Sequence, residues 1–426
     1  MRDFIRAQNL KKQICAMLAL FVLLPCLFTL LMTLSYAIPN AAVEQSAARS
    51  IAMLEEEGIY ASVNLGARVV RTDNWTDRLM LEKTQKAAGN SLLRAAMIPD
   101  YARYWHGYQV LLRPALAICN LTVSSIEKQI STDAAQPLPA LAMLRRVNEI
   151  VLLALLAAVL ILIVKQLNGW IALCFVIAVG FGDAIVVPMS LQYSVAAYVM
   201  LLACLALLLF CHNPRFCEHV CVGFFLIGAT TSFFDLLTVP LITFGMPAAL
   251  LVMIEMASAK CVRLDIARLA LRGVCWAFGY GGIWACKWAI ASIVLRRNVF
   301  AEALNQMRLR AFGDAPLPVN LPPTIYTLLN NLTHLIFPIA LLIAAIAALA
   351  VIAVMLCRHR ANTVRIVKTS IPLFLLCIAP YVWYLIFLNH SQEHGRFTYR
   401  AQIIAVFAIL GFFVCLLKEK KERSHG

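Results

Sequence analysis

Long apolar runs separated by short polar segments dominate this chain. A helix rises about 1.5 Å per residue, so about 20 apolar residues are needed to cross the roughly 30 Å hydrocarbon layer of a bilayer. Runs close to that length lie at residues 14–36, 148–165, 168–188, 192–211, 219–235, 238–257, 272–294, 333–356, 369–389 and 400–417. The pattern predicts an all-α polytopic membrane protein with about ten transmembrane helices. The stretch 219–257 contains Pro240 and Pro247 and is expected to hold a broken helix.

Residues 38–147 interrupt this pattern with a polar composition and helical periodicity. We predict a helix there that begins at Asn40, an N-cap residue type, and stops at Gly58. Its apolar stripe consists of Val43, Ala47, Ile51 and Leu54. The chain is therefore divided into a cytoplasmic N-terminus with the first transmembrane helix (1–37), a helical extracytoplasmic loop domain (38–147), transmembrane helices 2–10 with an outer loop at 295–330 (148–417), and a basic cytoplasmic tail (418–426).

Lys and Arg residues indicate the orientation, because they concentrate on the cytoplasmic side of membrane proteins. In a ten-span chain their four groups all fall on one side: 2–12, 260–272, 358–368 and 418–423. We therefore expect an integral protein of the plasma (inner) membrane. Both termini should lie in the cytoplasm, and residues 38–147 should lie outside. A signal peptide cut after Ala37 is the alternative for the first span, but its apolar run exceeds the usual h-region of about 7–15 residues.

Composition supports the same class. Apolar residues make up 62% of the chain and charged residues 14%, and the formal net charge is +15. The basic residues occur in short clusters between apolar runs, which indicates membrane topology and lipid contact and excludes a nucleic-acid partner. Nearly all of the 14 cysteines lie in or beside apolar runs, and only Cys119 lies in the outer domain, so no disulfide framework is implied.

Two carboxylates stand four residues apart at the start of a second helix predicted in the outer domain. If Asp73 is the N-cap, Asp77 lies one turn further on the same side. Such a pair serves as a general base or as ligands for a metal. A helix cap and a first-turn acid would explain it equally well. We name Asp73 and Asp77 as candidate catalytic residues; no cofactor is indicated with certainty, and a divalent cation is compatible with the pair.

The segment 101–108 is dense in aromatic side chains. As a helix it would carry on one face Tyr101, Tyr104, Trp105 and Tyr108. Rings on such a face lie among lipid headgroups or offer flat surfaces to sugar rings. Tyr104 and Trp105 are therefore candidate substrate-binding residues, and His106 and Arg113 are candidate donors to phosphate.

Ionisable residues inside apolar spans are costly and mark functional sites or buried partners. Asp183, Asp235 and Lys287 are all expected in the outer half of the membrane, where they are candidate substrate-binding residues. Glu255 lies towards the inner end of its span. It is the one residue that favours a path across the bilayer, as in a transporter.

The last outer loop, 389–400, is rich in hydrogen-bond donors. We expect it to contact phosphate or sugar through His390, His394, Arg396 and Arg400. Two histidines four residues apart also suit a metal, but a third ligand is not evident. A solvated turn with interfacial anchors is the alternative. The outer loop 295–330 is either a lid over a cavity or a plain connector.

The layout of one span, a long exported helical loop with acids, and many closely spaced helices resembles the GT-C superfamily of membrane glycosyltransferases. Four strings look like those of uncharacterised bacterial membrane proteins associated with surface-glycan synthesis: DNWTD (73–77), YARYWHGY (101–108), FFDLLTVPLITFGMP (233–247) and NHSQEHGRFTYR (389–400). The resemblance implies an essential acid in the first outer loop, which Asp73 or Asp77 would supply. The family's acid usually lies nearer the first span, where this chain has Ile38, Pro39 and Asn40.

By this resemblance the protein moves a sugar from a polyprenyl-phosphate donor to an envelope glycan or lipid acceptor at the outer face. A carboxylate would activate the acceptor hydroxyl, and cationic residues would neutralise the leaving phosphate. A lipid-linked glycan transporter or flippase, a surface-polysaccharide polymerase or ligase, and a non-catalytic subunit are the alternatives. A transporter predicts internal repeats, and we find no clear repeat.

Overall fold

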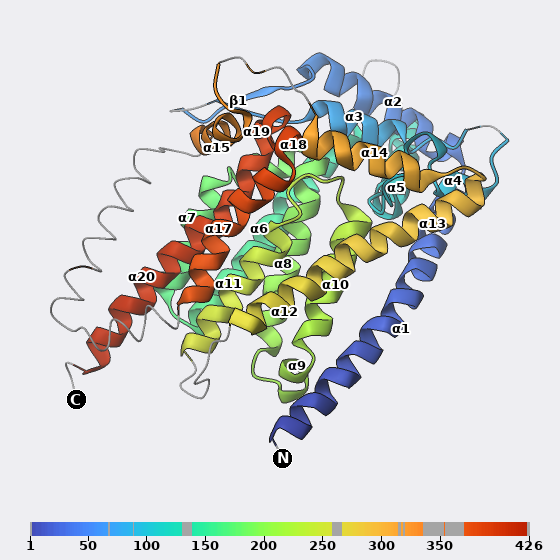
Figure 1. Cartoon of the computed structure of the whole chain (residues 1–426). Helices are drawn as coiled ribbons and strands as arrows, with labels where there is room; N and C mark the ends of the chain where they lie inside the picture. The colour runs from blue at the N-terminus through green and yellow to red at the C-terminus, as the bar shows by residue number, and fades with distance from the viewer. Residues whose placement is uncertain are drawn as a thin grey trace.

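The structure is a computed structural model that describes residues 2–66, 69–87, 89–129, 139–257, 266–313, 317, 320–334, 353 and 370–423. It is 81% helical (Figure 1). Within the described residues, strand pairing is confined to an antiparallel pair in which Ser62 lies opposite Arg71. The predicted all-α class is confirmed.

The elements follow one another along the chain with few interruptions. In order they are α1 (Arg2–Ala37), α2 (Asn40–Glu57), β1 (Ser62–Asn64), β2 (Val69–Arg71), α3 (Asn74–Glu82), α4 (Leu92–Ala96), η1 (Pro99–Tyr101), α5 (Gln109–Gln129), α6 (Ala140–Gln166), α7 (Gly169–Phe181), η2 (Val187–Met189), α8 (Leu191–Phe210), α9 (Pro214–Glu218), α10 (Val220–Phe234), α11 (Ile242–Ala257), α12 (Ile266–Ala277), η3 (Phe278–Gly282), α13 (Ile283–Leu295), α14 (Val299–Phe312), α15 (Pro323–Thr333), α17 (Ile371–Ile386), α18 (Leu388–Glu393), α19 (Gly395–Thr398), η4 (Tyr399–Gln402) and α20 (Ile403–Arg423).

Among the described residues, five helical stretches are long and apolar enough to cross a membrane: Leu10–Ala37, Ala140–Gln166, Leu191–Phe210, Ile266–Leu295 and Gly395–Leu416. Each coincides with a predicted span. Helices α7, α10, α11 and α17 are apolar but shorter, and they coincide with four more. The tenth predicted span, 333–356, falls almost entirely outside the described residues. The count of ten therefore stays a prediction.

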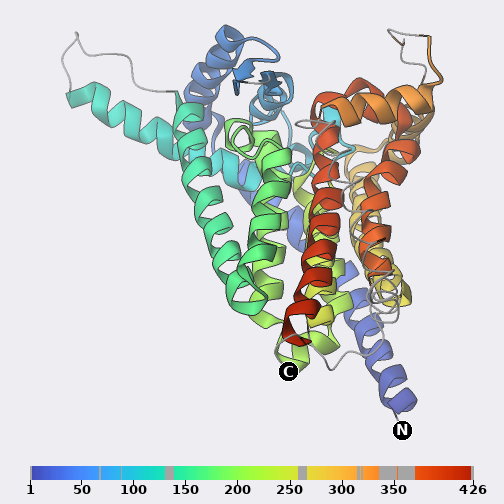
Figure 2. The ribbon, with the colours of Figure 1, turned by 90° about the vertical axis from the view of Figure 1, so that its left-hand side faces the viewer.

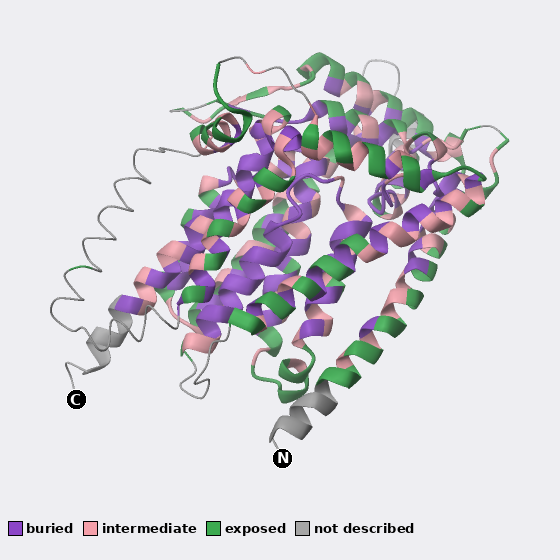
Figure 3. Cartoon of the chain, viewed as in Figure 1, coloured by how far each residue is buried: buried purple, intermediate pink, exposed green. Residues whose placement is uncertain are grey.

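The exterior of the helical bundle is apolar, as a protein surrounded by lipid requires. Val22 on α1, Leu153 on α6 and Ile293 on α13 are all exposed. Figure 3 shows the buried residues gathered inside, with α11 at the centre. Every residue of α11 from Ile242 to Ile254 is buried. These observations support an integral membrane protein, because water would not tolerate so much exposed apolar surface.

The broken helix expected between 219 and 257 is instead two separate helices, and α11 continues without interruption through Pro247. Helix α10 ends at Phe234 and α11 begins at Ile242. Both carboxylate oxygens of Asp235 accept the backbone N–H of Thr238, at 3.2 and 3.1 Å, which closes the turn between the two helices. The turn brings Leu237 to a positive φ of 65°.

The segment that follows α1 forms a separate layer at one end of the bundle. Helices α2, α3 and α14 lie at that end, while the start of α1 and the end of α20 lie at the other (Figures 1 and 2). Helix α2 has the predicted apolar stripe, with Val43, Ala47 and Leu54 buried, and Gly58 follows it at φ 86°. Its N-cap is Pro39, whereas the Asn40 side chain bonds the backbone of Lys86.

Candidate functional site

The segment 388–402 returns the chain over the layered end of the bundle and is held there by α15. Asn331 of α15 accepts a hydrogen bond from the Thr398 hydroxyl (2.7 Å) and donates one to the carbonyl of Ser391 (2.9 Å). Its own carbonyl accepts from Gln402 (2.8 Å). A Cβ at Gly395 would lie 2.3 Å from the Asn330 side chain, which would have to move to admit a larger residue. The predicted loop 295–330 thus contributes an anchoring helix rather than a plain connector.

Asp73 is the N-cap of α3, as predicted, and it faces into the protein. Its oxygens accept hydrogen bonds from the N–H and the hydroxyl of Thr76, at 3.1 and 3.0 Å, and it is 4% exposed. Burial raises the pKa of Asp73 above its ordinary 3.8, although the Thr76 hydrogen bonds and the charges of Arg396 and Arg400 act in the opposite direction. The carboxylate and both guanidinium groups therefore lie within electrostatic reach of one another. Within the described chain, no direct ion pair joins them.

Arg400 is a buried cation whose hydrogen-bonding capacity is largely unused. Its Nε donates to the carbonyl of Gly182 (3.1 Å), and its guanidinium carbon lies 4.0 Å from the centre of the Tyr193 ring. Neither Nη atom makes a hydrogen bond of acceptable geometry with the described residues, although the side chain is buried. An unsatisfied buried guanidinium is costly, and its planar fork fits a phosphate in a bidentate manner.

Arg396 reaches back to the outer domain. Its guanidinium carbon lies 3.6 Å from the centre of the Tyr60 ring, in the turn that follows α2. Its Nε is likewise buried without a hydrogen bond among the described residues. Stacking on Tyr60 fixes the guanidinium while leaving its edges available for an anion.

His390 and His394 lie side by side, with ring centres 4.8 Å apart. His390 Nε2 is 3.0 Å from the carbonyl of Leu237 and must donate to it, which leaves Nδ1 as an acceptor. Arg310 of α14 donates to His394 Nε2 at 2.7 Å, which leaves Nδ1–H as a donor. Both Nδ1 atoms are buried without a partner in the described chain. Burial lowers the pKa of His394 to about 3, with Arg310 and Arg396 acting in the same direction, so the ring is neutral.

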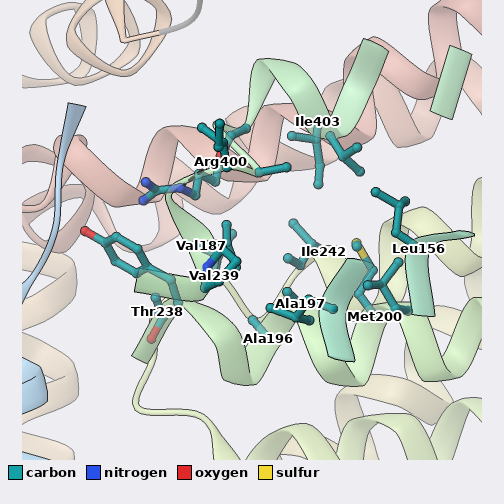
Figure 4. A pocket seen from close by; sticks show the side chains of 18 of the residues that line it. Leu156, Val187, Ala196, Ala197, Met200, Thr238, Val239, Ile242, Arg400 and Ile403 are labelled. Carbon is teal, nitrogen blue, oxygen red and sulfur yellow. Dashed lines mark hydrogen bonds between the residues drawn. The ribbon is translucent and has the colours of Figure 1, made fainter. Parts of the chain in front are cut away.

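An apolar pocket of about 370 Å³ begins at Arg400 and runs between α6, α8 and the start of α11. Arg400 and Thr238 lie at one end, and Leu156 and Met200 at the other (Figure 4). Ile185, on its lining, is exposed on the apolar exterior of the bundle. The pocket is therefore suited to a hydrocarbon chain that enters from the bilayer with a polar head at Arg400.

Asp183 and Asp235 support this site rather than face a ligand. The Tyr399 hydroxyl donates to Asp183, next to the Gly182 carbonyl that accepts from Arg400. Asp235 accepts from the backbone of Thr238, which lines the apolar pocket. Both acids were predicted to contact substrate; their contacts indicate that they position Arg400 and the 235–241 turn.

Asp77 differs sharply from Asp73. It is fully buried, and its oxygens accept hydrogen bonds from the Ser190 hydroxyl and from the backbone N–H of Leu191 and Gln192, each at 3.0 Å. The carboxylate thus caps the start of α8 from outside that helix. The predicted four-residue spacing from Asp73 is present, but these contacts argue against a catalytic role for Asp77.

The prediction of an aromatic helix at 101–108 is wrong. Only the short η1 covers Tyr101, and His106 has a positive φ of 58°. Trp105 is fully buried and donates from Nε1 to the carbonyl of Ile283 (2.9 Å). Tyr104 packs on Trp284, with ring centres 5.3 Å apart. These rings form the core between the outer domain and the bundle instead of a sugar platform.

The polar groups predicted beside these rings are also engaged internally. His106 contacts the Tyr108 hydroxyl (2.8 Å) and the Tyr101 carbonyl (2.9 Å), and burial lowers its pKa to about 3. Arg113 donates to the carbonyl of Ser35 (3.0 Å) and covers the end of α1. The predicted phosphate contact of His106 therefore finds no support in the geometry, whereas Arg113 keeps one buried Nη1 without a partner among the described residues.

Lys287 is not in contact with Asp73, Arg396 or Arg400 among the described residues. Its fully buried ammonium donates to the carbonyl of Met97 (3.2 Å) and lies 5.5 Å from the centre of the Trp105 ring. Lys287 therefore lies against the segment 97–105, and its neighbours there could not be predicted from the sequence.

Two contributors to the site were missed. Arg310 lies in the predicted outer loop 295–330, and Tyr193 lies inside the predicted span 192–211. The amphipathic helix around Arg310 was the available signal, because a helix lying across the bundle must direct one face towards 390–400.

The described residues do not form a metal site. No group of three or more His, Cys, Asp or Glu residues suited to a metal occurs among them. The site defined by Asp73, Arg396, Arg400, His390, His394 and the apolar pocket is called the outer site below. Comparison with protein-family models, with curated proteins and with solved structures gives no match to this chain.

Proposed function

We propose that this protein is a membrane glycosyltransferase that moves a sugar from a polyprenyl-phosphate donor to an envelope glycan or lipid acceptor at the outer face. One observation carries the proposal: the charges of Arg396 and Arg400 act on the buried carboxylate of Asp73, and Arg400 stands at the end of an apolar pocket. An acid, two cations and a lipid pocket are the parts that this reaction needs.

The reaction assigns a role to each charge. The acceptor oxygen attacks the anomeric carbon, the bond from that carbon to the phosphate oxygen breaks, and its electron pair leaves with the lipid phosphate. Asp73 takes the acceptor's proton, and its raised pKa favours this role. Arg396 and Arg400 neutralise the charge that develops on the phosphate.

The pocket and the histidines account for the rest of the donor. The polyprenyl chain lies in the apolar pocket beside Leu156 and Met200. The acceptor nitrogen of His390 and the donor nitrogen of His394 suit sugar hydroxyls, which both donate and accept hydrogen bonds. A neutral imidazole pair does not compete with the arginines for phosphate.

The transporter alternative has lost its main support. Glu255, the residue that favoured a path through the membrane, pairs with Arg272 on the neighbouring helix α12, with Nη1 3.2 Å from Oε2. A polymerase or ligase would use the same chemistry with a longer donor glycan. The proposal retains cytoplasmic termini and the plasma membrane, because the start of α1 and the end of α20 lie opposite the outer domain (Figure 2).

The direct test gives purified protein a panel of polyprenyl-phosphate sugars and measures transfer. Asp73→Asn is expected to lower kcat by roughly 10²-fold or more. Arg400→Lys keeps the charge but loses the fork, and is expected to raise KM for the donor as well. Glu44→Gln, which changes an exposed acid on α2, is the matched control. Transfer at the wild-type rate in both site variants would refute the assignment.

A further inference from the structure

A second cleft, of about 460 Å³, lies on the outer domain between the end of α2 and one side of α3 along its whole length. Five residues that line it carry the argument: Glu55, Ile59, Trp75, Arg78 and Glu82. We call it the Trp75 groove. It is separate from the outer site, and none of its residues was assigned a role above.

The apolar part of the groove is exposed but rigidly built. Trp75 is 52% exposed and Ile59 60% exposed. The backbone N–H of Trp75 donates to the Ile59 carbonyl (3.2 Å), and the Asn74 side chain donates to the Gly58 carbonyl (2.9 Å). A large aromatic ring held open to solvent in a cleft is typical of a binding surface.

The rim of the groove is polar and nearly balanced in charge. Arg78 pairs with Glu55 (2.9 Å) and with Glu82 (2.8 Å). One cation and two anions disfavour an acidic ligand such as a phospholipid headgroup. Each carboxylate keeps lone pairs that accept from hydroxyl groups, while the ring offers a flat apolar face. A sugar can use both the carboxylates and the Trp75 ring. The C–H groups on one face of the sugar pack on the aromatic ring, and the hydroxyls at its edge donate to the carboxylates.

The Trp75 groove and the outer site share a wall. Ile59 lines the groove, and the next residue, Tyr60, stacks on Arg396. On the other side, Trp75 follows the catalytic candidate Asp73 by two residues, in the same helical turn. The groove therefore adjoins the outer site through Tyr60, and the reacting end of a bound glycan is expected at that junction.

We infer that the Trp75 groove binds the oligosaccharide part of the acceptor, as a neutral or amino-sugar glycan rather than an acidic one. Its role as an acceptor site rests on the proposed function. The binding itself does not, because it needs neither donor nor catalysis.

The binding test uses the full-length protein in detergent and three hexasaccharides: maltohexaose, chitohexaose and hexagalacturonate. Titration calorimetry is expected to detect maltohexaose or chitohexaose, and to find hexagalacturonate weaker. Trp75→Ala should weaken binding about tenfold, a change of 1.4 kcal/mol, whereas Trp75→Phe keeps a ring and should stay within about threefold. Trp170→Ala, which removes an exposed tryptophan at the start of α7, is the matched control.

Each alternative outcome is decisive. Failure of all three glycans to bind, or equal binding by Trp75→Ala, overturns the inference. Loss of binding to anionic vesicles in Trp75→Ala, with glycan binding unchanged, would make Trp75 a membrane anchor and overturn it too. Trp75-dependent glycan binding without sugar transfer refutes only the proposed function. Sugar transfer with the same acceptor KM in Trp75→Ala as in wild type refutes only the claim that the Trp75 groove binds the acceptor.

Discussion

Asp77 and Ser190 are 113 residues apart in the sequence, and the Ser190 hydroxyl donates a hydrogen bond of 3.0 Å to the Asp77 carboxylate. The same carboxylate accepts the backbone N–H of Leu191 and Gln192. One buried side chain therefore ties the outer domain to the first turn of α8. This link is an N-cap supplied from a distant part of the chain, because the first N–H groups of a helix need acceptors from outside the helix.

Removal of this link should destabilise the protein without removing any reactive group. Asp77→Ala leaves three buried donors unsatisfied, at a cost of about 1–3 kcal/mol each before relaxation. We expect a lower midpoint of thermal unfolding in detergent, with residual transfer by the protein that stays folded. A variant that unfolds at the wild-type temperature but no longer transfers sugar would instead make Asp77 catalytic.

Stability should also depend on pH through this residue. Burial raises the pKa of Asp77 from 3.8 to about 7, despite the hydrogen bonds that it accepts. Between these values the folded protein holds a proton that the unfolded chain has released. The contribution of Asp77 is therefore fully present below about pH 4 and is lost as pH rises through 7. Compared with Asp77→Asn, which does not titrate, wild-type stability should fall over this range in thermal melts.

Gly107 marks the tightest contact between the outer domain and the bundle. Its N–H donates to the Phe233 carbonyl (2.8 Å), and an added Cβ would lie 2.5 Å from the Phe233 ring. Gly107→Ala should lower the free energy of unfolding by about 1–3 kcal/mol. Gly169→Ala adds a methyl group in open space and serves as the control. Equal melting of the two variants would contradict this account of the interface.

Lys287 is expected to be dispensable for chemistry. It is buried beside Met97 and Trp105 without an acidic partner in the described residues. Lys287→Met replaces a costly buried charge with an apolar side chain of similar length, so stability should hold or rise. Transfer by Lys287→Met should match wild type. A loss of transfer with unchanged melting would show that Lys287 takes part in the proposed reaction.

The aromatic segment shows where sequence reasoning fails. The spacing of Tyr101, Tyr104 and Trp105 matches a helix, yet the chain turns at His106 with a positive φ. The turn is stabilised by tertiary contacts, namely the hydrogen bond from Trp105 to Ile283 and the approach of Gly107 to Phe233. Both partners lie more than a hundred residues away, so the local pattern could not reveal them.

The sequence by itself determined the apolar helices, the polar segment between the first two, and the cap at Asp73. These follow from local rules: bilayer thickness sets the length of apolar runs, and short polar side chains cap helices. Tertiary structure alone decided that Arg396 and Arg400 act on Asp73, whereas Asp77 contacts the start of α8, Lys287 contacts Met97 and Arg113 contacts Ser35. Asp73 and Asp77 carry the same charge, but packing gives them different partners. Those partners are distant in the chain, so local sequence rules could not predict them.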